Sequence, residues 1–267
     1  MKKYFQVFKV SLSQEFAYRL NFVMWRVRNV IQILILFSFW NIIFSDNHIN
    51  FFGYDRSKIL TYVFGILVLR AIVLSARVVD VAGEISSGSL TNLLLKPVSY
   101  FKYWFCRDMS SKVLNLAFSI IEISILFIWL KPPIFIQKDV KVLIPFLISL
   151  TLAIGLYFLI LFLVNLVSFW MPENAWAAQF LFIFIILEFF AGGIFPLDIL
   201  PDFLFKISSY LPFYYLLFFP LQVYLGKISL FLVLKGIVIS LAWLLILSFA
   251  LNRVWHKGLS VYNAEGR

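Results

Sequence analysis

Five charged side chains interrupt otherwise apolar stretches of this sequence: Arg70, Arg77, Glu122, Glu188 and Lys235. A charge deep in membrane hydrocarbon costs at least about 2.5 to 3.5 kcal/mol on insertion scales, so such residues usually pair with an opposite charge or face water. Arg77 and Lys235 fall near the ends of their apolar stretches, whereas the other three fall inside them. The chemistry open to these three is ion pairing or contact with a polar part of a transported molecule.

Arg70 and Glu122 lie near the middle of neighbouring apolar stretches, and we predict that they pair with each other. A salt bridge that only holds the fold together is the more ordinary role for such a pair. Glu188 precedes the pair Gly192 and Gly193, and we treat it as a candidate for lining a substrate path.

Residues for enzymatic chemistry are sparse. Cys106 is the only cysteine, and the two histidines are far apart in the chain, so neither a disulfide within the chain nor a metal site is expected. The segment nearest to a phosphate-binding loop has Gly83 and Gly88 at the right separation but Ser89 where the lysine must stand. We therefore expect no catalytic residue, no metal, no cofactor and no ATP site in this chain.

The composition indicates a membrane protein. Of 267 residues, 63% are hydrophobic and 13% are charged, and the mean hydropathy is +0.95, whereas a soluble domain carries about a quarter charged residues. A hydrocarbon core of about 30 Å needs about 20 apolar residues per helix, which leaves room for roughly six crossings and for no soluble catalytic domain. The net charge of +10 lies mainly beside apolar stretches, so we expect no nucleic-acid partner.

The apolar pattern predicts an all-α integral membrane protein with six spans, at residues 22–44, 59–79, 113–130, 142–170, 176–193 and 228–251. Residues 1–21 form a separate unit. Phe5, Phe8, Leu12 and Phe16 recur at helical spacing, which predicts an amphipathic helix in the inner interface. The alternative is the first turn of a longer membrane helix. Residues 22–267 form the six-span domain.

Basic residues decide the orientation, because they gather on the cytoplasmic side of membrane proteins. Arg26 and Arg28 begin the first span and can extend to the headgroups. We predict that both termini are cytoplasmic. The predicted inner groups hold Lys2, Lys3, Lys9, Arg19, Arg26, Arg28, Lys96, Lys102, Arg107, Lys112, Arg253, Lys257 and Arg267, and the outer connectors hold Arg56, Lys58, Lys131, Lys138, Lys141, Lys206 and Lys227.

Residues 84–97, between the second and third spans, predict a short cytoplasmic helix. Ser89 is placed to cap it and Pro97 to end it. Leu90, Leu93 and Leu94 then share one face, and an apolar face exposed to the cytoplasm needs a partner groove.

Residues 195–226 do not fit a simple span. Pro196, Pro201, Pro212 and Pro220 interrupt the segment, and its apolar part at 213–225 is only about half a bilayer long. Such backbone is tolerated at membrane depth only where protein or a water-filled cavity covers it. We predict a re-entrant outer segment before the sixth span.

The two segments resemble known motifs. A glutamate followed by Gly-Ser-Leu, a leucine run and Lys-Pro-Val-Ser is similar to the cytoplasmic coupling region of ABC-2 type transporter permeases. The block Gly-Gly-Ile-Phe-Pro-Leu-Asp at 192–198 is similar to the outer re-entrant segment of that family. The variant looks most like the subgroup of multidrug or viologen-type export permeases. Ser89 stands where the family commonly has threonine, and it keeps the hydroxyl.

The resemblance implies the permease subunit of an ABC exporter in the cell (inner) membrane, carrying an amphipathic or lipid-like substrate. A separate ATPase subunit would bind ATP and Mg, and a second permease, identical or related, would complete the assembly. The implied ATPase-coupling residues are Glu84, Gly88, Ser89, Leu90, Leu93, Leu94 and Pro97; the candidate path residues are Glu188, Glu122 and Arg70; and the re-entrant residues are Gly192, Gly193, Pro196, Pro201 and Pro212.

Three alternatives stay open. An ion-coupled secondary transporter would show mid-membrane acids and an internal repeat, and we find no repeat. An intramembrane enzyme would need paired carboxylates or nucleophiles within the spans. A permease-like structural partner, with no path of its own, is the third.

Overall fold

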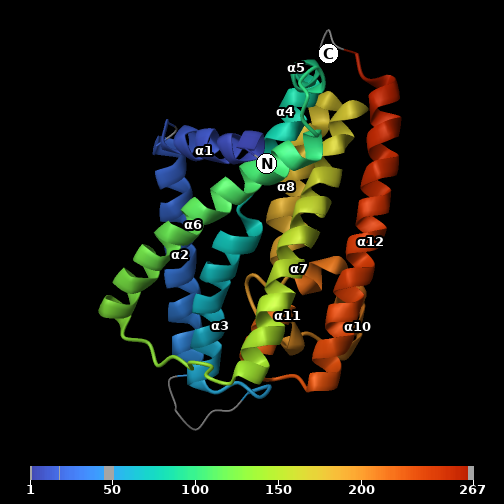
Figure 1. Cartoon of the computed structure of the whole chain (residues 1–267). Coiled ribbons are helices and arrows are strands. Elements are labelled where there is room, and N and C mark those ends of the chain that lie inside the picture. The colour runs from blue at the N-terminus through green and yellow to red at the C-terminus, as the bar shows by residue number, and fades with distance from the viewer. Residues whose placement is uncertain (1, 18, 45–50, 264–267) are drawn as a thin grey trace.

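The computed structural model describes residues 2–17, 19–44 and 51–263, and within these ranges the chain is helical apart from turns, loops and a single bridge between Phe51 and Tyr54. Figure 1 shows a bundle of long helices with shorter ones at both ends. Six helical stretches of the described chain are long and apolar enough to cross a membrane. The predicted all-α class with six spans is confirmed.

The six spans are built from single helices or from consecutive helical pieces. In chain order, the elements are α1 (Lys2–Ala17), α2 (Arg19–Ile43), α3 (Arg56–Leu69) with the π-helical turn Arg70–Leu74, the short helices Val78–Asp80, α4 (Val81–Ser86) and α5 (Leu90–Leu94), α6 (Tyr100–Leu130), α7 (Val140–Asn165) with Leu166–Phe169, Pro172–Asn174, α8 (Ala175–Phe180), the π-helical turn Leu181–Ile186, α9 (Leu187–Phe190), Leu197–Ile199, α10 (Asp202–Tyr210), Pro212–Tyr215, α11 (Phe218–Tyr224) and α12 (Leu230–Val261).

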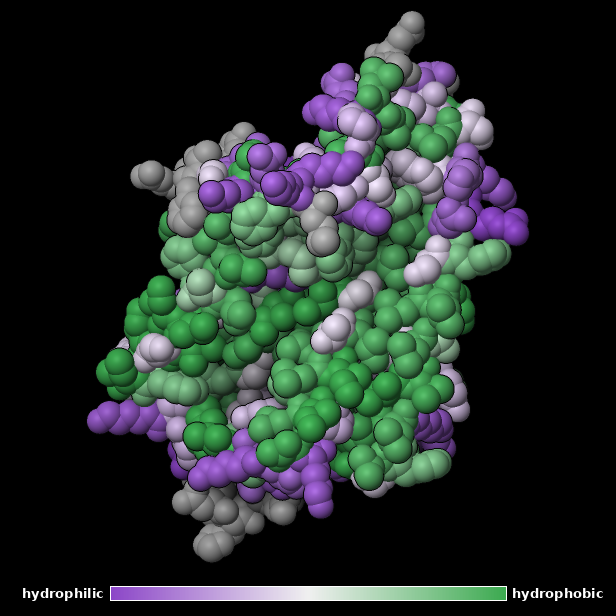
Figure 2. Space-filling view, in the orientation of Figure 1, coloured by the Kyte–Doolittle hydropathy of each residue, from purple (hydrophilic) through white to green (hydrophobic). Residues whose placement is uncertain are grey.

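The bundle has two distinct ends (Figure 1). The α5 end carries α1, which lies across the bundle, together with α4, α5 and the last described residues. The opposite end carries the connectors at 51–55, 131–139 and 226–229. Figure 2 shows a hydrophobic belt around the middle with hydrophilic side chains toward both ends, as a membrane protein requires.

The third span is longer than predicted. The sequence placed its start at 113, but α6 begins at Tyr100 and has 31 residues. The prediction was wrong because it treated the charges before 113 as a cytoplasmic connector. Two of those charged residues, Asp108 and Lys112, are buried inside the protein and therefore do not need water. Figure 1 shows that α6 runs obliquely across α2 and α3.

The second span ends earlier than predicted. Its α-helix passes into a π-helical turn at Arg70–Leu74, and the chain becomes extended at Ser75, where ψ is 121°. Residues 75–77 therefore separate the second span from the short helices that lead to α4. This break lies between the membrane bundle and the α4–α5 segment.

An aromatic cluster joins α6, α7 and α12 near the α5 end. The ring of Trp255 stacks on Tyr100 with centroids 4.8 Å apart and packs edge-on against Phe169 at 5.7 Å. The fit depends on Gly258, one turn after Trp255, because a Cβ there would stand 2.7 Å from Cγ of Phe169 and nearer still to two other ring atoms.

Replacing Gly258 by valine should lower the free energy of unfolding by about 1–3 kcal/mol, because the added side chain overpacks the cluster. Thermal unfolding in detergent, followed by tryptophan fluorescence, measures the change. Gly83→Val is the matched control, since nothing lies within 4 Å of a Cβ on that helical glycine. Equal melting temperatures for the two variants would contradict this account of the packing.

Candidate functional site

The α4–α5 segment presents only part of the leucine face that the sequence predicts. Leu90 is fully buried and Leu93 is 8% exposed, whereas Leu94 is 43% and Leu95 81% exposed. The prediction of one exposed stripe over Leu90, Leu93 and Leu94 is therefore wrong. Leu90 and Leu93 belong to the protein's own hydrophobic core, and the exposed apolar edge is Leu94 with Leu95.

The turn before α5 is made by Gly88 rather than by a capping serine. Gly88 has φ +75°, a conformation that side chains other than glycine rarely adopt. Ser89 makes no capping hydrogen bond; its hydroxyl donates to the carbonyl of Glu84 at 3.3 Å. The predicted cap is thus wrong, while the break before Pro97 is confirmed, because α5 ends at Leu94.

Three other helices hold the α4–α5 segment in place. The hydroxyl of Tyr262, just after α12, donates to the carbonyl of Gly88 at 2.6 Å and accepts from the amide of Thr91 at 3.3 Å. From α6, the hydroxyl of Tyr100 donates to Glu84 at 2.9 Å. From α1, the ammonium of Lys3 donates to the carbonyl of Pro97 at 2.6 Å. The segment and the residues just after it are therefore hydrogen-bonded to α1, to α6 and to the residue that follows α12.

Glu84 is the half-buried carboxylate of this segment. Burial raises the pKa of Glu84, and the hydrogen bond from Tyr100 and the charge of Arg107, 4.0 Å away, act in the opposite direction. Glu84 thus anchors α4 to the start of α6.

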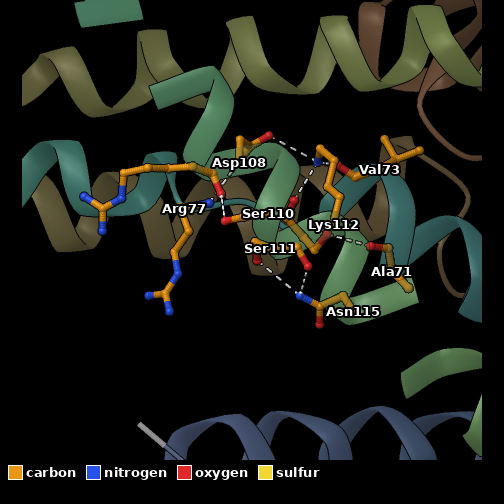
Figure 3. A network of polar contacts seen from close by, with 10 residues as sticks. Ala71, Val73, Arg77, Asp108, Ser110, Ser111, Lys112 and Asn115 are labelled. Carbon is orange, nitrogen blue, oxygen red and sulfur yellow. Dashed lines mark hydrogen bonds and ion pairs between the residues drawn. The ribbon is translucent and has the colours of Figure 1, made fainter. Parts of the chain in front are cut away.

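A second polar cluster lies where the second span breaks (Figure 3). Lys112 of α6 donates to the carbonyls of Val73 and Ser75 at 2.8 and 2.5 Å, and its Nζ lies 3.3 Å from Oδ2 of Asp108. The other oxygen of Asp108 accepts from the backbone amide of Arg77 at 2.9 Å. Both side chains are almost fully buried.

The sequence contains a signal for this cluster in the spacing of polar residues along α6. Asp108, Lys112, Asn115, Ser119 and Glu122 recur three or four residues apart, so they share one face of α6. Figure 3 shows Asp108 and Lys112 pointing toward Arg77 and Val73 at the break of the second span, and Asn115 bonded to Ser111 of α6 itself. A polar stripe on an otherwise apolar helix indicates that this face is covered by protein.

The intramembrane charges pair differently from the prediction. Arg70 forms a bidentate ion pair with Glu188, in which Nη1 of Arg70 lies 2.7 Å from Oε1 of Glu188. Arg70 also donates to the carbonyl of Gly193 at 3.1 Å. Glu122 pairs with Arg26 instead, at 3.1 Å. The predicted pair of Arg70 with Glu122 is wrong, because tertiary packing brings α9 to the second span and α2 to Glu122.

Arg26 does not extend to the headgroups as predicted. It is buried, and besides Glu122 it donates to the backbone and side-chain oxygens of Asn115 at 2.8 and 2.7 Å. The pair lies in a groove of about 320 Å³ whose other walls are apolar side chains of α2 and α6. Arg77 pairs with Asp80 at 3.6 Å, and Lys235 is exposed near the start of α12.

The predicted re-entrant segment consists of short pieces rather than one hairpin. Pro196 and Pro201 immediately precede Leu197–Ile199 and α10, and Pro212 begins the helical turn that follows α10. α11 is buried from Phe218 to Val223. Covered backbone of this kind meets the condition for irregular structure at membrane depth. Its depth in the bilayer stays a prediction.

Two contacts fix the start of this segment. Gly192, at φ +76°, lies so close to Tyr62 that a Cβ would stand 2.7 Å from the hydroxyl, and that hydroxyl donates to the Gly192 carbonyl. Further along, Lys227 donates to Asp198 at 2.8 Å and lies over the ring of Tyr54. Burial lowers the pKa of Lys227, and the contact with Asp198 opposes that shift.

Comparison with known proteins gives one family. A family model described as "ABC-2 family transporter protein" matches residues 30–266, which is most of the chain. Comparison with curated proteins gives no match.

Replacing Arg70 by methionine should lower the free energy of unfolding by about 3–5 kcal/mol, because it leaves Glu188 buried without its charged partner. The double variant Arg70→Met with Glu188→Met should recover part of the loss. Thermal unfolding in detergent tests this, with Lys235→Met as the control at an exposed position. A double variant less stable than the sum of the two single changes would refute the pairing.

Proposed function

The chain belongs to the ABC-2 transporter family, and from this premise we propose that it is the membrane-spanning permease subunit of an ATP-binding cassette exporter, driven by a separate ATPase subunit. The observation that carries the proposal is the exposed edge formed by Leu94 and Leu95 at the tip of the α4–α5 segment. The edge is apolar and lies at the α5 end of the bundle, one of the two ends where hydrophilic side chains gather (Figures 1 and 2).

The α4–α5 segment has the two properties that an ATPase contact needs. It offers apolar side chains to a partner groove. It is also rigidly attached, because Tyr262, Tyr100 and Lys3 bind it to three other helices. A push on Leu94 and Leu95 would reach the membrane spans through these contacts. Glu84 and Gly88 act by shaping and anchoring the segment, and Leu90 and Leu93 by seating it on the bundle.

ATP and Mg belong to the partner subunit in this proposal. A second permease, a copy of this chain or a related one, would complete the path for an amphipathic or lipid-like molecule. The α5 end, with both termini, would face the cytoplasm of the cell membrane. Its exposed basic side chains agree with that orientation: those of Lys2, Lys3, Lys9, Lys96, Lys102, Arg253 and Lys257.

The intramembrane charges support a structural role more than contact with substrate. Both oxygens of Glu188 are engaged by Arg70, and Glu122 is paired with Arg26. We therefore assign Arg70 and Glu188 to holding the turn at Gly193, through which they position the outer segment. Within the part of the chain that the structure describes, the two acids proposed for a path, Glu122 and Glu188, are both ion-paired, which favours the ABC permease over the ion-coupled transporter.

Replacing both Leu94 and Leu95 by aspartate should abolish copurification of an ATPase subunit from detergent-solubilised membranes. Burying a leucine contributes about 1.5–3 kcal/mol, so losing two should weaken binding by at least about tenfold. The variant should still insert and fold, because both positions are exposed.

Two further variants separate docking from folding. Ile136→Asp changes an exposed apolar residue in the connector at the opposite end of the bundle, and it should leave copurification intact. Leu90→Asp introduces a charge at a buried position and should unfold the segment. If the wild type brings down no ATPase while its own oligomer survives solubilisation, the proposed function fails.

A further inference from the structure

We propose that Asp108 and Lys112 of α6 form a clamp across the break at residues 75–77, so that a displacement of the α4–α5 segment moves the second and third spans together. The proposal rests on the function proposed above and adds the residues that carry the movement into the membrane.

The break leaves backbone groups that need partners. The helix of the second span ends at Leu74, and its last carbonyls have no amide to accept from in the next turn. Lys112 donates to one of these oxygens, that of Val73, and to the carbonyl of Ser75, the first residue of the break. Its Nζ also lies 3.3 Å from Oδ2 of Asp108, with which it forms an ion pair.

The other side of the break is held by Asp108. The short helix Val78–Asp80 begins just after Arg77, and the Arg77 amide donates to Oδ1 of Asp108 at 2.9 Å. A carboxylate thus lies at the start of one helix and an ammonium at the end of the other. Each charge has the sign that the helix dipole favours at that position.

The two clamp residues are one turn apart on a single helix. Their side chains are 0% and 6% exposed, so water cannot replace them. A buried ion pair whose two members also bind backbone groups is costly to separate from its contacts. The break therefore cannot open, and α4 cannot change its angle to the second span, unless α6 moves with them.

The same helix face continues the connection along the membrane. Asn115, one turn beyond Lys112, accepts from Arg26 of α2, and Glu122 pairs with Arg26. α6 is therefore attached to the α4–α5 segment, to the second span and to α2 through successive polar contacts. No substrate contact is required for this role, so Asp108 and Lys112 are positioning residues.

The test compares amide hydrogen exchange in the complex of permease and ATPase, with and without trapping by ATP and vanadate. In the wild type, trapping should change exchange in α4–α5 and also in residues 70–80 and 100–115. In Lys112→Met, the ATPase should still bind and hydrolyse ATP within about twofold of the wild-type rate, since Leu94 and Leu95 are intact. The change on trapping should then stay within α4–α5.

Three further variants make the result specific. Lys102→Met removes an exposed lysine from the same helix and should behave as the wild type. Lys112→Arg keeps the charge and several donors, and it should restore the exchange change on trapping in residues 70–80 and 100–115. Asp108→Asn keeps the acceptor for the Arg77 amide but removes the ion pair. It serves as the test variant if Lys112→Met is too unstable to purify, and it should reduce the exchange change in residues 70–80 and 100–115.

Equal spread of the exchange change in wild type and Lys112→Met would overturn the clamp while leaving the proposed function intact. Failure of the wild type to bind any ATPase would overturn the proposed function, and the clamp with it. In the permease alone, Lys112→Met should speed exchange at residues 75–80. Unchanged exchange there would also contradict the clamp.

Discussion

A charged or hydrogen-bonding group in hydrocarbon must find its partner within the protein, and this constraint organises the whole chain. α6 shows it most clearly, since the polar stripe from Asp108 to Glu122 fixes which face of the helix turns inward. Once that face is fixed, α2 is positioned through Arg26 and the end of the second span through Lys112. The segment that begins at Gly192 follows the same rule through Arg70, which donates to the carboxylate of Glu188 and to the carbonyl of Gly193.

Much of the architecture follows from the sequence, because hydropathy reports directly on the solvent. The class, the six spans and the break before Pro97 all come from apolar length and helix-breaking residues. The sequence did not show which charged residues form ion pairs with each other. Arg70 lies near mid-span, and spacing along the chain cannot say whether Glu122 or Glu188 will reach it, because either helix can pack there. The start of α6 was missed for the same reason, since Asp108 and Lys112 are solvated by protein rather than by water.

The leucine face of α5 illustrates a further limit. A helix of five residues is too short to have one buried and one exposed side defined by its own pattern. Its orientation is set by Gly88 and Tyr262, which lie outside the helix. Leu90 and Leu93 are therefore core residues of the bundle, and the surface left for a partner is displaced toward the end of the helix.

The length of α12 has a consequence for the space around the protein. Its 32 residues, at 1.5 Å each, span about 48 Å, whereas the hydrocarbon core of a bilayer is about 30 Å thick. α6 is nearly as long but runs obliquely, while α12 runs beside α7 and reaches the height of α4 and α5 (Figure 1). The polar last turns of α12, after which Tyr262 contacts Thr91 of α5, would therefore extend beyond a hydrocarbon core of that thickness. A partner docked on α5, as proposed above, would stand off from the bilayer at a height set by helix length and membrane thickness rather than by the lipid headgroups.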